Sequence, residues 1–138
     1  MLLLPVPIQN ILAIKNHNSN NDLTLLMELQ RIYKTSFEMS HIIPNHPVCG
    51  VNHGHSYQLL VSLNGDSDKW LDFHDIKSLI ESEIQSRYDH KVDPITKQVY
   101  AITAEQMAVD LSSYLKRNGY SGYLELYETS KYGIRLDF

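Results

Sequence analysis

Residues 55–63, HSYQLLVSL, follow a period of two, and this periodicity limits the folds open to the chain. The side chains that share a side with His55 are Tyr57, Leu59, Val61 and Leu63, whereas Ser56, Gln58 and Ser62 fall opposite. Successive side chains of an extended chain point to opposite faces, so the segment is predicted to be a strand with one buried face. The turn-forming sequence Asn-Gly-Asp at 64–66 ends this strand.

Two later segments have the periodicity of amphipathic helices. In the first, Asp72 is placed as an N-cap, and the apolar positions that recur at helical spacing are Ile76, Leu79, Ile80 and Ile84. The second begins at Thr103, which is predicted to form a capping box with Gln106, and Gly119 lies where a left-handed residue ends many helices. Glu81 in the first helix is predicted to lie on a solvated face.

Two further segments resemble strands, and together with the helices they indicate the fold class. Residues 30–41 alternate imperfectly around aromatic side chains, and residues 122–130 alternate well enough for a final strand. Strands first, helices between and a strand last predict an α+β fold, an antiparallel sheet with two helices packed on one face.

The composition excludes several classes of protein. The 138 residues, 43% of them hydrophobic, suit one globular domain. A single cysteine, Cys49, excludes an internal disulfide and a cysteine-rich zinc finger. The formal charge of −4 gives no attraction to phosphate backbones, so we expect no nucleic-acid partner. The apolar start, MLLLPVPIQNILAI, is interrupted by two prolines and a glutamine, so we expect a cytoplasmic protein without membrane contact.

The N-terminal part differs in character from the rest. Residues 16–22, NHNSNND, are the most polar and turn-rich stretch and resemble a linker. We therefore expect residues 1–29 to form an extension with an Asn-rich linker and residues 30–138 to form a single domain.

The densest chemistry lies in C-G-V-N-H-G-H, residues 49–55. His53 and His55 are two positions apart on a predicted strand, so both imidazoles can point to one place, and Gly54 leaves room between them. A third nitrogen ligand would leave zinc one open position, as in catalytic sites. His41 is the best third ligand because a hairpin-like return would bring it alongside, and His46 competes from the intervening loop. An H-x-H pair alone is a weak signal, and a lone cysteine is more often a small buried side chain than a catalytic one.

Six motifs occur in an order that resembles a known family. They are F-x-x-x-H (37–41), C-x-x-x-H-G-H (49–55), W-x-D-F (70–73), D-H (89–90), T-A-E (103–105) and E-T (128–129). Over about residues 30–138 the chain is similar to the 6-pyruvoyl-tetrahydropterin synthase family, which includes 6-carboxy-5,6,7,8-tetrahydropterin synthases. After the D-H motif the chain departs from the family pattern at Lys91, Val92 and Asp93.

The resemblance implies roles for nine residues. The zinc ligands would be His41, His53 and His55. The catalytic groups would be Cys49 as a general base, with Asp89 and His90 as a proton relay. Glu128 would anchor the pterin ring, and Thr103 and Glu105 would also bind substrate. It also implies the tunnelling fold, in which a homo-oligomer assembles around a barrel and active sites form between neighbouring subunits.

The spacing between Cys49 and the H-G-H motif favours one branch of the family. Three residues separate Cys49 from His53, a spacing typical of 6-carboxytetrahydropterin synthases. We therefore expect a zinc-dependent lyase that converts 7,8-dihydroneopterin triphosphate to 6-carboxytetrahydropterin, acetaldehyde and triphosphate in queuosine or other 7-deazaguanine biosynthesis. The alternatives are a 6-pyruvoyl-tetrahydropterin synthase and a catalytically silent pterin-binding homologue.

Overall fold

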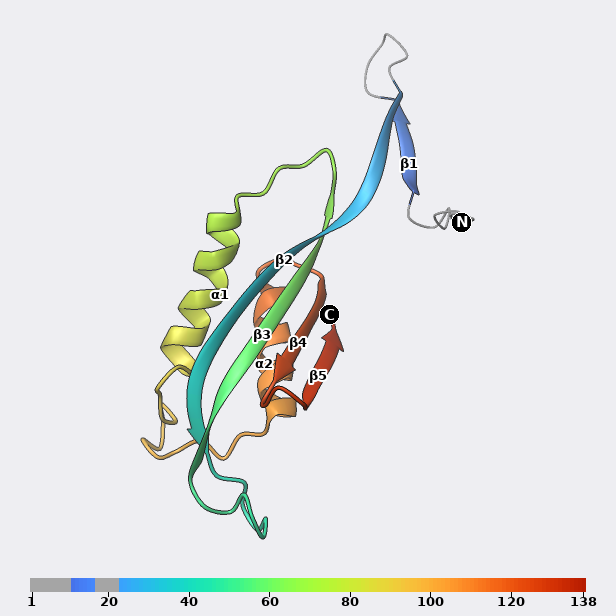
Figure 1. Ribbon diagram of the computed structural model, residues 1–138. Coiled ribbons are helices and arrows are strands. Elements are labelled where there is room, and N and C mark those ends of the chain that lie inside the picture. The colour runs from blue at the N-terminus through green and yellow to red at the C-terminus, as the bar shows by residue number, and fades with distance from the viewer. Residues whose placement is uncertain (1–10, 17–22) are drawn as a thin grey trace, which may run out of the picture.

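The computed structural model describes residues 11–16 and 23–138 (Figure 1). Along the chain the elements are β1 (Ile11–Asn16), β2 (Leu23–His41), β3 (His53–Asp66), α1 (Phe73–Arg87), α2 (Ala104–Arg117), β4 (Gly122–Tyr127) and β5 (Gly133–Asp137). No helix of the described part is both long and apolar enough to cross a membrane.

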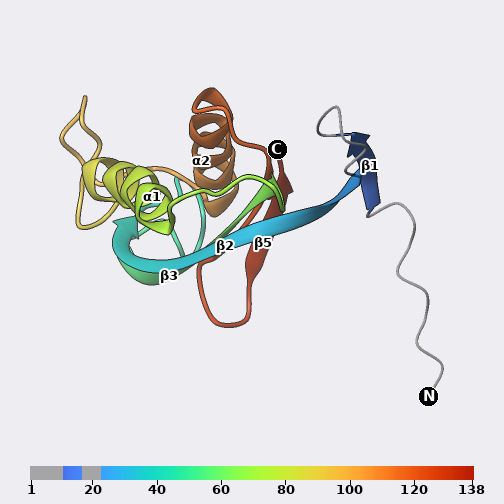
Figure 2. The same ribbon diagram turned by 90° about the horizontal axis from the view of Figure 1, so that it is seen from above.

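The strands form one antiparallel sheet in the order β1-β2-β3-β4-β5. The longest ladder joins β2 to β3 and runs from Glu28 opposite Asp66 to His41 opposite His53. Both helices lie on the same side of this sheet, as Figure 2 shows. The α+β class with two helices on one face of an antiparallel sheet is therefore confirmed.

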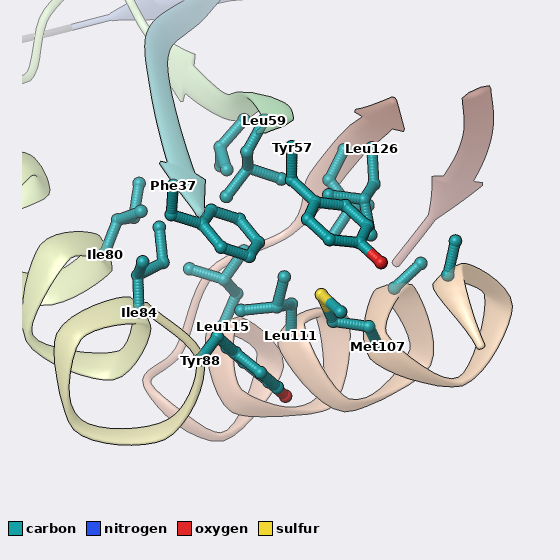
Figure 3. Close-up of a cluster of buried hydrophobic side chains, with 14 of the residues drawn as sticks. Phe37, Tyr57, Leu59, Ile80, Ile84, Tyr88, Met107, Leu111, Leu115 and Leu126 are labelled. Atoms are coloured by element: carbon teal, nitrogen blue, oxygen red, sulfur yellow. The ribbon is translucent and has the colours of Figure 1, made fainter. Parts of the chain in front are cut away.

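The core lies between the helices and the covered face of the sheet (Figure 3). All four apolar residues that the alternation of residues 55–63 places on one side are buried. Tyr57 stacks on Phe37 of β2, with ring centroids 5.2 Å apart. The helices contribute Ile76, Ile80, Ile84, Met107, Leu111 and Leu115. Each such side chain contributes about 1.5–3 kcal/mol on full burial, so this packing holds the sheet and the helices together.

The predicted helix boundaries are confirmed by the capping contacts. The Asp72 side chain accepts a hydrogen bond from the His74 N–H, and the Thr103 hydroxyl accepts one from the Gln106 N–H. Gly119 has a φ of 89°, the left-handed conformation expected just beyond the second helix.

The structure differs from the sequence predictions at several strands. β2 begins at Leu23 rather than at residue 30, and it passes without a break through the boundary expected between residues 29 and 30. Residues 1–10 and 17–22, which include most of the predicted linker, lie outside the described residues. The strand predicted at 122–130 ends at Tyr127, where the chain begins its return to β5. β5 itself was not predicted, because it is only five residues long.

Glu81 is also placed differently from the prediction. It is half-buried, and its Oε1 accepts hydrogen bonds of 2.6 Å from the Tyr33 and Thr35 hydroxyls of β2. The prediction of a solvated face was wrong for this residue, because β2 passes close enough to α1 to present two hydroxyl donors.

Candidate metal centre

Four side chains converge at one end of the β2–β3 ladder. His41 ends β2, His53 and His55 begin β3, and Glu128 directly follows β4. The strand register places His41 opposite His53 and Met39 opposite His55. Because residues two apart on a strand share a face, all three imidazoles reach the covered side of the sheet. One ligand atom from each of the four residues lies within 4.8 Å of the others.

Backbone carbonyls fix the orientation of two imidazoles. His41 Nδ1 lies 2.8 Å from the Ile102 carbonyl oxygen, and His53 Nδ1 lies 2.8 Å from the Val51 carbonyl oxygen. A carbonyl only accepts hydrogen bonds, so each Nδ1 carries a proton and each ring turns Nε2, the nitrogen left to bind a metal, toward the cluster. These two Nε2 atoms are 2.9 Å apart, a separation at which their lone pairs repel unless a shared proton or a metal ion lies between or beside them.

The third imidazole has a buried nitrogen without a hydrogen bond. His55 Nε2 lies 2.9 Å from Glu128 Oε1, but the pair lacks hydrogen-bond alignment, and among the described residues this nitrogen has no hydrogen-bond partner. Burial lowers the pKa of His55, Glu128 opposes the shift, and His41 and His53 lower this pKa further. The lowered pKa favours the neutral ring, which is the form that binds metals.

The donor set suits a divalent transition metal. Glu128 Oε1 also lies 3.1 Å from His41 Nε2, so the cluster offers three imidazole nitrogens and one carboxylate oxygen. Zinc is bound by such ligands, as are other first-row divalent ions. The buried, unpaired nitrogen of His55 and the facing lone pairs of His41 and His53 fit a bound cation. The His/Glu cluster could therefore hold a metal ion.

Asp89 and His90 form a second group, against the part of β2 that lies beyond its pairing with β1. His90 Nδ1 lies 2.9 Å from Asp89 Oδ1, and the same oxygen accepts a hydrogen bond from the Glu38 N–H at 3.0 Å. The His90 N–H donates to the Glu38 carbonyl at 2.8 Å, so both residues are fixed against β2. His90 and His55 line the same surface hollow, of about 450 Å³.

Glu128 opens onto a second hollow, of about 670 Å³, whose walls include Gln58, Tyr127 and Thr129. Gly54, His55 and Ser56 line both hollows, so the two flank the metal-binding cluster. The volume of the hollow beside Glu128 lies within the range of small-molecule sites.

The remaining predicted residues lie in two other places. Thr103 caps α2, and Glu105 is exposed in the first turn of that helix, just beyond the Ile102 carbonyl that holds His41. Cys49 is half-buried in the loop between β2 and β3. The structure thus brings together the three predicted ligands and Glu128, keeps Asp89 with His90, and leaves Cys49 on its own loop.

Comparison with known proteins identifies the family. A profile of the 6-pyruvoyl tetrahydropterin synthase family matches residues 31–136. The chain belongs to this family. The Caenorhabditis elegans 6-pyruvoyl tetrahydropterin synthase structure gives a TM-score of 0.62 at 19% identity, over 82% of this chain and 96% of that chain, a likeness that establishes the fold.

Two curated relatives of the chain have names that are more specific than the family name. A putative 6-carboxy-5,6,7,8-tetrahydropterin synthase from Archaeoglobus fulgidus is 31% identical over 88 residues, which cover 62% of this chain and 74% of the relative. A 6-carboxy-5,6,7,8-tetrahydropterin synthase from Haemophilus influenzae is 36% identical over 63 residues, or 40% of this chain and 45% of the relative. The match therefore spans less than half of the Haemophilus protein.

Some contacts of the candidate site were not apparent from sequence. The carbonyls of Ile102 and Val51 orient the imidazoles, and the backbone of Glu38 holds Asp89 and His90. Backbone groups occur at every residue and leave no pattern in a sequence. The approach of Glu128 to the imidazoles depends on the pairing of β3 with β4, which places Gln58 opposite Tyr127.

Proposed function

We propose that this chain is a zinc-dependent 6-carboxy-5,6,7,8-tetrahydropterin synthase. It would convert 7,8-dihydroneopterin triphosphate to 6-carboxytetrahydropterin, acetaldehyde and triphosphate, on a route to queuosine or another 7-deazaguanine. The observation that carries the proposal is the convergence of the Nε2 atoms of His41, His53 and His55 on one place beside two hollows. The names of the curated relatives favour the carboxy-forming reaction.

His41, His53 and His55 would hold the zinc ion, with Glu128 at its side. Bound zinc supplies Lewis acidity, which stabilises negative charge that develops on substrate oxygens. The carbonyls of Ile102 and Val51 accept the Nδ1–H groups of His41 and His53, which leaves Nε2 of each ring to bind the ion.

Cys49, Asp89 and His90 would move protons. The Cys49 thiolate would act as the general base that removes a proton from the substrate side chain, a role helped by a nearby cation that favours the thiolate. Asp89 Oδ1 accepts the Nδ1–H of His90, which leaves His90 Nε2 directed outward to take up or return a proton.

Glu128 would anchor the pterin. A carboxylate accepts two parallel hydrogen bonds from an amino-pyrimidine edge, and the hollow beside Glu128 is large enough for the bicyclic ring. Thr103 and Glu105, at the exposed start of α2, would contribute further contacts to substrate. The family resemblance also leads us to expect that neighbouring subunits of a homo-oligomer complete each site.

The test is the product of the reaction. The zinc-loaded protein is incubated with 7,8-dihydroneopterin triphosphate, and acetaldehyde and the pterin product are measured. We expect acetaldehyde and 6-carboxytetrahydropterin, and Cys49→Ala should abolish both while retaining about one zinc per chain. A pyruvoyl product without acetaldehyde would contradict the proposal in favour of a 6-pyruvoyl-tetrahydropterin synthase. Pterin binding without turnover would identify a silent homologue.

A further inference from the structure

The loop between β2 and β3 holds the backbone of Cys49 on both sides. The Cys49 N–H donates a 2.7 Å hydrogen bond to His46 Nδ1, and the Cys49 carbonyl accepts a 2.8 Å bond from the Ile43 N–H. With both peptide groups fixed, the direction of the Cα–Cβ bond is fixed as well. The thiol retains only the rotation about that bond, among about three staggered positions.

His46 closes this loop with its side chain. Its Nδ1 also accepts a 3.1 Å hydrogen bond from the Val48 N–H, so one ring nitrogen receives two successive backbone donors. Such an acceptor has no hydrogen of its own, and the ring proton therefore lies on Nε2. Asp and Asn side-chain oxygens hold turns in the same way.

The neighbouring backbone supports the same arrangement. The His46 N–H donates to the Ile43 carbonyl at 3.3 Å. Gly50 packs so closely that a Cβ added there would lie 2.5 Å from the His46 carbonyl oxygen. Glycine at this position permits the chain to close beside His46, and any larger residue would displace the backbone next to Cys49.

These contacts also separate His46 from the other histidines. Although it competes with His41 for the third ligand position on sequence alone, it is exposed and its Nδ1 is occupied by backbone donors. The group of side chains that could hold a metal contains His41, His53, His55 and Glu128. The imidazole of His46 therefore holds the backbone of the loop between β2 and β3 by accepting hydrogen bonds.

We propose that His46 is a positioning residue for Cys49, which holds the loop so that the thiol keeps one direction toward its substrate. The proposal rests on the role of Cys49 in the proposed function. A base that is held in place needs no reorganisation before proton transfer, so loss of the acceptor lowers kcat and leaves KM and metal content unchanged.

Two variants separate the acceptor from the ring. His46→Phe keeps a ring without an acceptor, and His46→Asn places an oxygen at the δ position, where it can accept the same two N–H groups. Amide hydrogen exchange at Val48 and Cys49, measured by NMR on the zinc-loaded protein, reports the hydrogen bonds directly. kcat, KM and zinc content are measured on the same samples.

In His46→Phe we expect exchange at both amides to accelerate about tenfold. kcat should fall about tenfold with KM unchanged. His46→Asn should restore exchange and kcat to within about twofold of the wild type. His46→Ala is a second acceptor-free variant, and it should behave as His46→Phe does.

Three outcomes would overturn the proposal. Wild-type exchange at both amides in the two acceptor-free variants would show that His46 does not hold the loop. Faster exchange with wild-type kcat would refute the positioning role. An Asn variant with normal exchange and a low kcat would assign another role to the ring. Failure of the proposed function is distinguishable, because the wild type would then form no acetaldehyde or 6-carboxytetrahydropterin, whereas amide exchange at Val48 and Cys49 would still report whether His46 holds the loop.

Discussion

Two glutamates of this chain each bring one carboxylate oxygen to two side chains of the sheet. Glu81 Oε1 on α1 lies 2.6 Å from the hydroxyls of Tyr33 and Thr35. Glu128 Oε1 lies 3.1 Å from His41 Nε2 and 2.9 Å from His55 Nε2. The two clusters have similar shapes and both draw on the long β2–β3 hairpin, yet their chemistry differs.

The difference lies in where the hydrogens are. Each hydroxyl carries a proton that it donates to Glu81, so that cluster is satisfied by protein groups alone. At Glu128 the proton of His41 is held by the Ile102 carbonyl, and the nitrogens that face the carboxylate and each other present lone pairs. A cluster of imidazole nitrogens and a carboxylate lacks positive charge, which a metal ion would supply. Short distances between polar atoms therefore identify a metal site only after the donors have been counted.

The largest expected effect is the loss of metal when a ligand of the Glu128 cluster is removed. We expect the zinc content of His53→Ala to fall from about one ion per chain to below about a tenth, because the remaining groups no longer surround the ion. Glu81→Ala is the matched control and should retain full zinc. Elemental analysis of both purified variants makes the measurement. Full zinc occupancy in His53→Ala would contradict the ligand assignment.

The next effect is stabilisation by the metal, which should occur in one cluster only. Zinc at a free concentration about a hundredfold above its Kd contributes about 2.7 kcal/mol, which should raise the melting temperature of the metal-free protein by about 8 °C. Glu81→Gln should show the same rise, and His53→Ala should show none. Calorimetry of chelator-treated protein, with and without added zinc, gives these values. An equal rise in His53→Ala would place the stabilising ion elsewhere.

A smaller effect is expected when the satisfied cluster is broken. Glu81→Gln exchanges two hydrogen bonds to a charged acceptor for weaker neutral ones, so the free energy of unfolding should fall by about 1–2 kcal/mol. Zinc content should stay unchanged, since Glu81 contributes nothing to the metal-binding cluster. Denaturant titration of the metal-free wild type and variant measures the difference. A drop in zinc content in this variant would show that the two clusters are coupled.

The smallest expected effect is a change in the alkaline titration of one tyrosine. Burial, and then the hydrogen bond and charge of Glu81, raise the pKa of Tyr33 to about 12. The unfolded chain has a tyrosine pKa of about 10, so the folded protein keeps a proton that the unfolded chain loses. The resulting stabilisation is complete below pH 10 and is lost as the pH rises through about 12.

Tyr33→Phe removes this titration. The stability of the variant should therefore fall less steeply with pH in the alkaline range than that of the wild type. The difference between the tyrosinate absorbance titrations of the two proteins isolates this residue from the other tyrosines. A difference titration centred at the ordinary tyrosine pKa would show that neither burial nor Glu81 raises the pKa of Tyr33.

Local patterns were sufficient to predict the parts of the molecule that depend on a single segment. The period of two at 55–63 predicted β3 and the common face of His53 and His55, and Thr103 predicted the start of α2. β5 was missed because its five residues alternate but are too few to indicate a strand by themselves, and the strand forms through pairing with β4, where Leu136 lies opposite Leu124. Glu81 was misplaced because its partners lie on β2, 48 and 46 residues earlier in the chain.

The same limit applies to the candidate site. The spacing of His53 and His55, with His41 at the end of the preceding strand, indicated the cluster, and the structure brings these three together. The carbonyls that fix the ring protons and the proximity of Glu128 come from the tertiary arrangement of α2 and β4. The catalytic roles of Cys49, Asp89 and His90 stay predictions.

The register of the β2–β3 hairpin would give a metal ion bound by the His/Glu cluster a part in folding. His41 and His53 are the last pair of the ladder, directly opposite each other. A slip of one residue would turn every side chain of β2 to the other face and carry His41 away from its partners. An ion that needs all three imidazoles binds only the correctly paired hairpin, so its binding energy selects that pairing over the shifted alternatives. The metal would then favour the correct alignment of the two strands in addition to its role in the proposed reaction.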